Sequence, residues 1–402
     1  MTAKDFLNCA ESVENEIVEN RRWLHAHAET EFNLCETVSF VKEKLQEMGY
    51  EYHDCGKCGV TATVGNGASG KTFLLRADMD ALPVKEETKL PFSCEKGNMH
   101  ACGHDMHTAM LLGAAKILKK FENEINGTIK LMFQPAEETL SGAKNMIDNG
   151  VLKNPDVSAA MMLHVMAGFP LKSGTVIVPV SGVGAPAADY FTINVQGKGC
   201  HGSTPQLGID PVTAAAHILL GLQEISAREM GVTDEALVTV GSFHGGTAGN
   251  VIADSAVLQG TLRAFDDVIR DKIKKRISEI AEGIGCALRT KVTITFGSGC
   301  PTLTNDKELV SFTEKALVEL LGEDGVINAS AFGAENTHKG GSEDFAYISK
   351  EIPSVMLALA AGEPEKGFQY HQHHPKVVFD ESVLKIGSAV LAFNAFKWLE
   401  NT

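Results

Sequence analysis

The chain has 402 residues, of which 44% are hydrophobic and 22% are charged, the balance of an ordinary globular protein. This length favours two domains over one core. The formal net charge of −15 argues against a nucleic-acid partner, because phosphate binding needs clustered lysine and arginine.

The start of the chain, residues 1–18, has no cationic segment followed by an apolar run, so we expect no signal peptide. No apolar stretch approaches the roughly 20 residues that span a bilayer, so we expect no membrane partner. The nine cysteines are scattered and odd in number, which favours free thiols in a reducing cytoplasm over a disulfide framework. Cys55 and Cys58 form a C-x-x-C pair that suits a redox site or half of a zinc site, but no second pair accompanies it.

The first part of the chain alternates helical and strand patterns. Apolar residues at three- and four-residue spacing predict helices, and short apolar runs bounded by turns predict strands. Strands that alternate with helices indicate an α/β layer domain. The predicted helices are 16–27, 35–48 and 106–121, and the predicted strands are 60–64, 72–77, 128–133 and 159–164.

From about Asp189 the order becomes strand, helix, strand, strand, helix, strand, which is the ferredoxin-like arrangement. Helix–strand alternation then resumes. We therefore predict an α/β layer domain in two parts, 1–184 and 300–402, with a satellite domain, 185–299, inserted between them. The elements of the predicted satellite are strands 190–195, 237–243, 256–265 and 291–296, and helices 210–229 and 268–289.

The densest group of reactive side chains lies between His100 and His107, just before a predicted helix. Cys102 and His104 are two residues apart on a glycine-containing loop, so a thiolate and an imidazole can reach one metal ion. Asp105 is a candidate to orient a ligating imidazole through a hydrogen bond.

A second group, Gln134 to Glu138, directly follows the predicted strand 128–133, which Pro135 ends. Adjacent carboxylates on an irregular turn can point in different directions. One can then bind metal while the other acts as general base. Alone, this pair is a weak signal, because adjacent glutamates are more often a solvated surface pair.

Two histidine signals are weaker by themselves. His164 ends an apolar strand, where a side chain can enter an active-site crevice, although a lone histidine there is more often structural. The tract from His371 to Pro375 suggests metal binding by composition only. Cysteine, histidine and carboxylate donors together suit zinc, manganese or cobalt better than calcium or magnesium.

Residues 65–72 match the phosphate-loop pattern G-x-x-x-x-G-K-[ST], which suggests an NTPase that uses Lys71. That motif binds phosphate only where a helix follows it. A strand pattern follows here, so we predict a β-hairpin turn instead.

The chain resembles the aminoacylase and carboxypeptidase metallohydrolases, in the subgroup that holds hippurate hydrolases, N-acyl-amino-acid amidohydrolases and indole-acetyl-amino-acid hydrolases. The matches occur in the family's order over nearly the whole chain. They are 22–25, 75–83, 100–107, 134–138, 199–202, 250–252, 260–263, 341–345 and 373–375.

The resemblance implies an α/β/α catalytic domain, two divalent metal ions per subunit and a homodimer formed through the inserted domain. It places the general base at Glu137 and an orienting residue at Asp80. The residues implied to bind substrate or the oxyanion are His201, Asn250 and Arg263. The implied metal ligands are Cys102, His104, Glu138, His164 and His373, with His371 as the alternative to His373.

We therefore predict metal-dependent hydrolysis of the amide bond of an N-acyl amino acid or a related small conjugate. A metal-activated water attacks the carbonyl, and Glu137 accepts its proton. A dipeptidase or carboxypeptidase on the same fold is the first alternative. A catalytically silent metal-bound binding protein and a phosphate-loop NTPase are less favoured.

Overall fold

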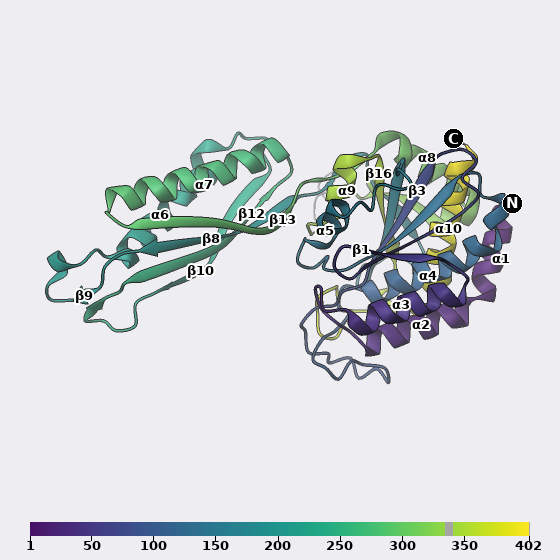
Figure 1. Ribbon diagram of the computed structural model, residues 1–402, viewed down its shortest axis with the longest axis horizontal. Coiled ribbons are helices and arrows are strands. Elements are labelled where there is room, and N and C mark those ends of the chain that lie inside the picture. The colour runs from purple at the N-terminus through teal and green to yellow at the C-terminus, as the bar shows by residue number, and fades with distance from the viewer. Residues whose placement is uncertain (334–340, 402) are drawn as a thin grey trace. The chain divides into compact units, whose positions relative to one another are not determined.

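The computed structural model describes residues 1–333 and 341–401, and Figure 1 shows its elements. The chain forms two compact units. The first contains residues 1–184 and the described residues from 304 onward, apart from 341 and 342. The second is centred on Ala185–Leu303. Within the described residues, no helix has the length and apolar character needed to cross a bilayer.

The first unit is built on an eight-stranded mixed sheet with the order β1-β2-β4-β3-β5-β16-β6-β15. The four central strands β4, β3, β5 and β16 are parallel to one another, so their carboxyl ends meet at one edge. The strands are β1 (Tyr52–Cys55), β2 (Gly59–Val64), β3 (Thr72–Asp78), β4 (Thr128–Gln134), β5 (Ala159–Met166), β6 (Val176–Val178), β15 (Val326–Asn328) and β16 (Ser354–Ala360).

Helices cover both faces of this sheet. Alternate residues of β3, such as Phe73 and Leu75, belong to the large apolar core with α4 and α10. The intervening Arg76 points to the other face, where it meets Phe345 beside α9, while α5 contacts β4. The helices are α1 (Ala3–Ser12), α2 (Glu14–Ala26), α3 (Cys35–Glu47), α4 (His104–Lys120), α5 (Gly142–Asp148), α8 (Lys307–Leu321), α9 (Ala346–Glu351) and α10 (Leu384–Glu400).

The second unit has its own apolar core beneath a four-stranded antiparallel sheet of order β10-β12-β8-β13. Asp210 and Asp266 cap its two helices by accepting backbone N–H bonds. This is the predicted ferredoxin-like order. Its elements are β8 (Ala187–Gln196), β9 (Cys200–His201), α6 (Pro211–Glu224), β10 (Ala236–Gly245), β11 (Val251–Ile252), β12 (Ser255–Ala264), α7 (Asp267–Ala287) and β13 (Lys291–Cys300). The chain passes between the units at β7 (Gly182–Ala185) and β14 (Leu303–Asn305).

The predicted mixed α/β class is confirmed, but the predicted hairpin at residues 65–72 is wrong. The strand β3 does follow this loop, so no helix is available to bind phosphate. However, β4 lies between β2 and β3 and pairs with both. The loop packs instead on the turn before β4, where Gly67 N donates to Gly127 O at 2.9 Å.

Candidate metal centre

The sheet gathers the predicted reactive residues at the carboxyl ends of its parallel strands. Asp80 follows β3, Glu137 and Glu138 follow β4, and His164 lies near the end of β5. The loop with Cys102 leads into α4, which begins at His104. Segments that are distant in sequence therefore converge on one edge, which is the usual position of a site in a parallel sheet.

Two imidazoles of this cluster are oriented by backbone carbonyls. His104 Nδ1 lies 2.8 Å from Asp80 O, and His164 Nδ1 lies 2.7 Å from Val165 O. A carbonyl only accepts, so each Nδ1 carries a proton, and in the neutral imidazole each Nε2 keeps its lone pair. His164 Nε2 lies 3.5 Å from Cys102 Sγ, within hydrogen-bonding distance of the thiol. Carbonyl bonds of this kind fix the tautomer of metal-binding histidines.

The other two predicted ligands adjoin this pair. His373 Nε2 lies 3.6 Å from Glu138 Oε1, and His104 Nε2 lies 3.9 Å from the same oxygen. All five predicted ligands thus fall into overlapping groups whose donor atoms lie within 4.8 Å of one another. The alternative ligand His371 is in none of these groups among the described residues, and its Nδ1 lies 3.2 Å from Ala167 O.

The donor atoms fit a soft or borderline cation. Among the described residues, two buried atoms, His104 Nε2 and Glu138 Oε1, have no hydrogen-bond partner, which is costly unless a ligand satisfies them. Burial raises the pKa of the Cys102 thiol to about 12, so its thiolate needs a cation beside it. Burial also lowers the pKa of His164 to about 3, which keeps that imidazole neutral and able to donate its lone pair.

Asp80, in the segment that follows β3, fixes the turn that contains the two glutamates. Asp80 Oδ1 accepts a bond from Glu137 N at 3.0 Å, and Asp80 Oδ2 accepts one from Glu138 N at 3.2 Å. Ala136 adopts the left-handed conformation at φ 54°, which a non-glycine residue rarely adopts. Asp80 therefore acts on the positions of Glu137, Glu138 and His104 and is a positioning residue.

A buried arginine and three carboxylates next to the site had no role in the sequence prediction. Arg76 donates to Asp78 Oδ2 at 2.7 Å, to Glu343 Oε1 at 2.8 Å and to Asp344 Oδ1 at 2.9 Å. The carboxylates of Glu343 and Asp344 also lie near that of Glu137. The available signal was Arg76 and Asp78 inside an otherwise apolar strand pattern, because buried charges are rare without a partner.

These carboxylates leave the centre with an excess of negative charge. Burial raises the pKa of Asp344 to about 8 despite the Arg76 guanidinium. Burial also raises the pKa of Glu137, with further contributions from Glu343, Asp344 and Glu138. A multivalent cation would relieve this repulsion.

Two other residues of the 100–107 cluster serve different purposes. Val165 N donates to His107 Nε2 at 2.9 Å, so the proton is on Nδ1, which donates to Asp78 Oδ1 at 2.6 Å. With both nitrogens engaged, His107 has no lone pair for a metal. Asp105 was expected to orient a ligating imidazole, but its carboxylate does not contact a predicted ligand. It pairs instead with Arg21 and His25 on α2.

The predicted substrate-binding residues lie in the second unit. His201 on β9 pairs with Val251 on β11, directly after Asn250, and Gly202 N donates to Asn250 O at 2.7 Å. Both side chains are exposed, whereas Arg263 is half-buried on β12. His201 and Asn250 are therefore neighbours, and their role in binding stays a prediction.

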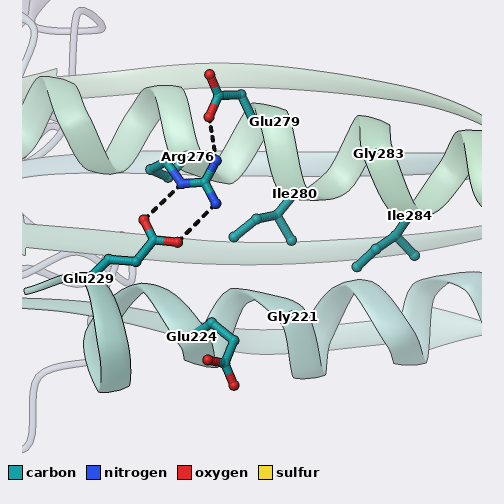
Figure 2. Close-up of a pocket in the computed structure, with 8 residues that line it drawn as sticks. All are labelled: Gly221, Glu224, Glu229, Arg276, Glu279, Ile280, Gly283 and Ile284. Atoms are coloured by element: carbon teal, nitrogen blue, oxygen red, sulfur yellow. Dashed lines mark hydrogen bonds and ion pairs between the residues drawn. The ribbon is translucent and has the colours of Figure 1, made fainter.

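A pocket in the second unit lies between α6 and α7 (Figure 2). Its cation, Arg276, is bound by Glu229 through two hydrogen bonds and also by Glu279. Gly221, Ile280 and Ile284 form its apolar part. No predicted site residue lines this pocket, so it is not the predicted active site.

The Peptidase family M20/M25/M40 matches residues 74–395. The chain belongs to this family. A crystal structure of a Bacillus subtilis dinuclear metal-binding M20 peptidase is similar to it, with 31% identity, a TM-score of 0.78 and coverage of 98% of this chain and 100% of the other. The match confirms the resemblance inferred from the sequence and supports a metal centre at the cluster.

Three curated relatives indicate the reaction class. The chain is 34% identical to N-acetyl-L-cysteine deacetylase of Bacillus subtilis, covering 97% of this chain and 90% of the relative. It is 36% identical to IAA-amino acid hydrolase ILR1-like 2 of Arabidopsis thaliana, covering 96% and 85%. It is 35% identical to thermostable carboxypeptidase 1 of Saccharolobus solfataricus, covering 97% of each. The predicted class, a metal-dependent amide hydrolase, is confirmed.

Proposed function

We propose that this protein hydrolyses N-acyl amino acids at a two-metal centre formed by Cys102, His104, Glu138, His164 and His373. The observation that carries the proposal is that, among the described residues, His104 Nε2 and Glu138 Oε1 are buried without a hydrogen-bond partner, next to Cys102 and His164 Nε2. These donors favour zinc, manganese or cobalt. When bound, such ions polarise an amide carbonyl and lower the pKa of water.

Glu137 is the general base in this proposal. It is buried, and burial raises its pKa, so it has the basicity to accept a proton from an attacking water. The bond from the water oxygen to the carbonyl carbon then forms. As the carbon–nitrogen bond breaks, Glu137 returns the proton to the leaving amine. Asp80 maintains the position of Glu137 through its backbone N–H.

The proposed substrate class is supported by the names of two relatives and by the predicted substrate-binding residues of the second unit. Two of the relatives are named for N-acyl amino acids or indole-acetyl conjugates, which supports a small acylated amino acid as substrate. Arg263 is proposed to pair with the substrate carboxylate, for which a planar guanidinium is suited, and His201 and Asn250 to bind the oxyanion or carboxylate. A homodimer through the second unit and a cytoplasmic location remain part of the proposal.

The alternative is a carboxypeptidase or dipeptidase, since one relative has a carboxypeptidase name. Both reactions cleave an amide beside a carboxylate, so a substrate panel distinguishes them. N-acetyl, N-benzoyl and indole-acetyl amino acids and simple dipeptides are assayed after chelation and again after addition of Mn²⁺, Zn²⁺ or Co²⁺. We expect activity on the acylated amino acids that chelation abolishes and metal restores. Preference for dipeptides would favour the alternative, and activity that survives chelation would overturn the metal mechanism.

A further inference from the structure

A buried chain of charged side chains connects the N-terminal helix α2 to the first turn of α4. Asp105, directly after the proposed ligand His104, is fully buried, and its Oδ2 lies 2.8 Å from His25 Nδ1 and 2.8 Å from Arg21 Nε. His25 Nε2 lies 3.2 Å from each carboxylate oxygen of Glu86. His25 thus faces a carboxylate with each ring nitrogen.

This arrangement requires a doubly protonated His25. Burial opposes its protonation, but the hydrogen bonds to Asp105 and Glu86 outweigh burial and raise its pKa. Two cations, Arg21 and His25, then balance two buried carboxylates, Asp105 and Glu86. Removing one member leaves a buried charge uncompensated, which is strongly unfavourable.

Glu86 belongs to an irregular loop, residues 83–98, which the bridge between Leu82 and Met99 closes. The Glu86 carboxylate also accepts bonds from Thr88 Oγ1 and from Cys94 N at 3.2 Å, so it holds the loop's own fold. Phe92 of the same loop packs on the Arg21 guanidinium at 4.9 Å and edge-on against His25. The loop is therefore fixed to α2 through these contacts.

The same loop reaches the segment of the proposed ligand His373. Glu87 N donates to Pro375 O at 2.8 Å, two residues after His373, and Lys376 pairs with Glu87. His373 itself has a side chain that is 56% exposed and a backbone at φ 66°, and its N–H donates to Ala101 O. Its position therefore depends on neighbouring segments more than on its own packing.

We propose that His25 and Glu86 are positioning residues for the metal centre, because they connect the segment of His104 to the segment of His373 through the 83–98 loop. This inference rests on the proposed metal centre. Neither residue touches the proposed ligands. Their effect should appear in metal affinity. Residues that hydrogen-bond a ligand directly change metal affinity by about 10- to 100-fold, and we expect the lower end of that range for residues that act through one further residue.

The test measures metal binding by the full chain, not turnover. Wild type, Glu86→Gln and His25→Gln are made metal-free and titrated with Zn²⁺ against a competing chelator, with bound metal counted by elemental analysis. The matched control is Glu36→Gln, which removes an exposed ion pair between Glu36 and Lys96 of the same loop, at 2.8 Å. We expect the control to match wild type. In Glu86→Gln and His25→Gln, we expect at least a tenfold loss of affinity for one of two ions.

Tryptophan fluorescence of each metal-free variant establishes that it is folded at the titration temperature. This control is needed because lower stability does not change the metal affinity of protein that is folded, so a loss of affinity in folded protein reports on the site. Folded Glu86→Gln and His25→Gln that bind both ions with wild-type affinity would overturn the inference. A loss of equal size in Glu36→Gln would also overturn it, since any disturbance of the loop would then suffice. A wild type that binds no Zn²⁺ would instead overturn the proposed metal centre.

Discussion

Glu137 and Glu138 are adjacent in the chain and yet have different surroundings. Both carboxylates approach His104 Nε2, at 3.9 Å for Glu138 and 4.0 Å for Glu137. The Glu138 carboxylate also lies 3.6 Å from His373, whereas that of Glu137 lies in the group with Glu343 and Asp344. Their backbone N–H groups are held by the two oxygens of one carboxylate, Asp80. A left-handed Ala136 starts the turn. One short turn therefore supplies two carboxylates with different surroundings, which suits the two roles proposed for them.

Glu137→Gln tests this division. Glutamine keeps the shape but cannot accept the proton of water, so we expect turnover to fall about 10²- to 10⁴-fold while metal content stays at the wild-type value. The matched variant Glu138→Gln should lose metal. Activity assays and elemental analysis of both proteins check this, and an active Glu137→Gln would remove Glu137 from the base role.

As a proposed metal ligand, Cys102 should make metal binding depend on pH. Burial raises its thiol pKa to about 12, so at neutral pH the metal-free protein holds this proton and loses it when a metal binds the thiolate. The metal-bound form has fewer protons, so a rise in pH strengthens binding. His164, with a pKa lowered to about 3, contributes no proton in this range.

Calorimetric titration in buffers of different ionisation enthalpy counts the released protons. We expect Cys102→Ala to release about one proton fewer than wild type, in addition to binding metal more weakly. Cys94→Ala, which removes another buried thiol of the same unit, is the control and should match wild type. Equal proton release by Cys102→Ala and wild type would show that Cys102 is not a thiolate ligand.

Helices and strands with a strong local sequence pattern could be predicted, whereas the order in which strands pair in the sheet could not. The strands β3 and β4 follow from apolar runs such as Phe73 to Ala77, and α7 follows from its long amphipathic period. The helix α1 was missed, because Val13 alone separates its last residue, Ser12, from the start of α2. The hairpin error at residues 65–72 arose because a local sequence does not reveal that β4 inserts between β2 and β3.

The residues of the proposed metal centre likewise include some that the sequence identifies and others that only tertiary contacts identify. Cys102, His104 and the glutamate pair stand in dense polar motifs that a reader of the sequence can recognise, and the resemblance added His164 and His373. The Arg76 network joins residues more than 260 positions apart, including Glu343 at a sequence separation of 267. Asp105 was given the wrong partner, because its carboxylate turns to α2, a contact that depends on tertiary packing.

The backbone at the start of α4 sets the relative positions of two proposed ligands, Cys102 and His104. Gly103, between two proposed ligands, has φ 91°, and a Cβ there would clash with Val165 Cγ2 and lie 3.1 Å from Phe379 Cζ. Gly97 has a similar φ of 86° but nothing within 4 Å of its missing Cβ. Alanine substitutions at these two positions therefore distinguish the effect of backbone strain from that of a steric clash.

We expect Gly97→Ala to cost about 1–2 kcal/mol of unfolding free energy from left-handed strain alone, with unchanged metal affinity. Gly103→Ala should cost more, and it should weaken metal binding at least tenfold by displacing Cys102 from His104. Urea denaturation and Zn²⁺ titration of the two proteins measure both effects. Equal metal affinity in Gly103→Ala and Gly97→Ala would contradict the role given to the helix start.

At the scale of the whole molecule, the chain contains two cores of different character. The first unit holds the proposed ligands, whereas the second has a separate apolar cluster between its sheet and α6 and α7. Both tryptophans of the chain, Trp23 and Trp398, belong to the first unit. Tryptophan fluorescence therefore reports on the unfolding of that unit alone, while circular dichroism reports on both.

Metal binding should stabilise only the unit that provides the ligands. A metal at a free concentration of 100 times its dissociation constant adds about 2.7 kcal/mol to the unfolding free energy of that unit. We expect the fluorescence transition to move up by several degrees on metal addition, while a second transition seen by circular dichroism stays in place. The control is Cys102→Ala, whose fluorescence transition should respond less to metal. Equal upward shifts of both transitions in wild type would show instead that the two cores unfold as one, and that metal binding in the first unit stabilises the entire chain.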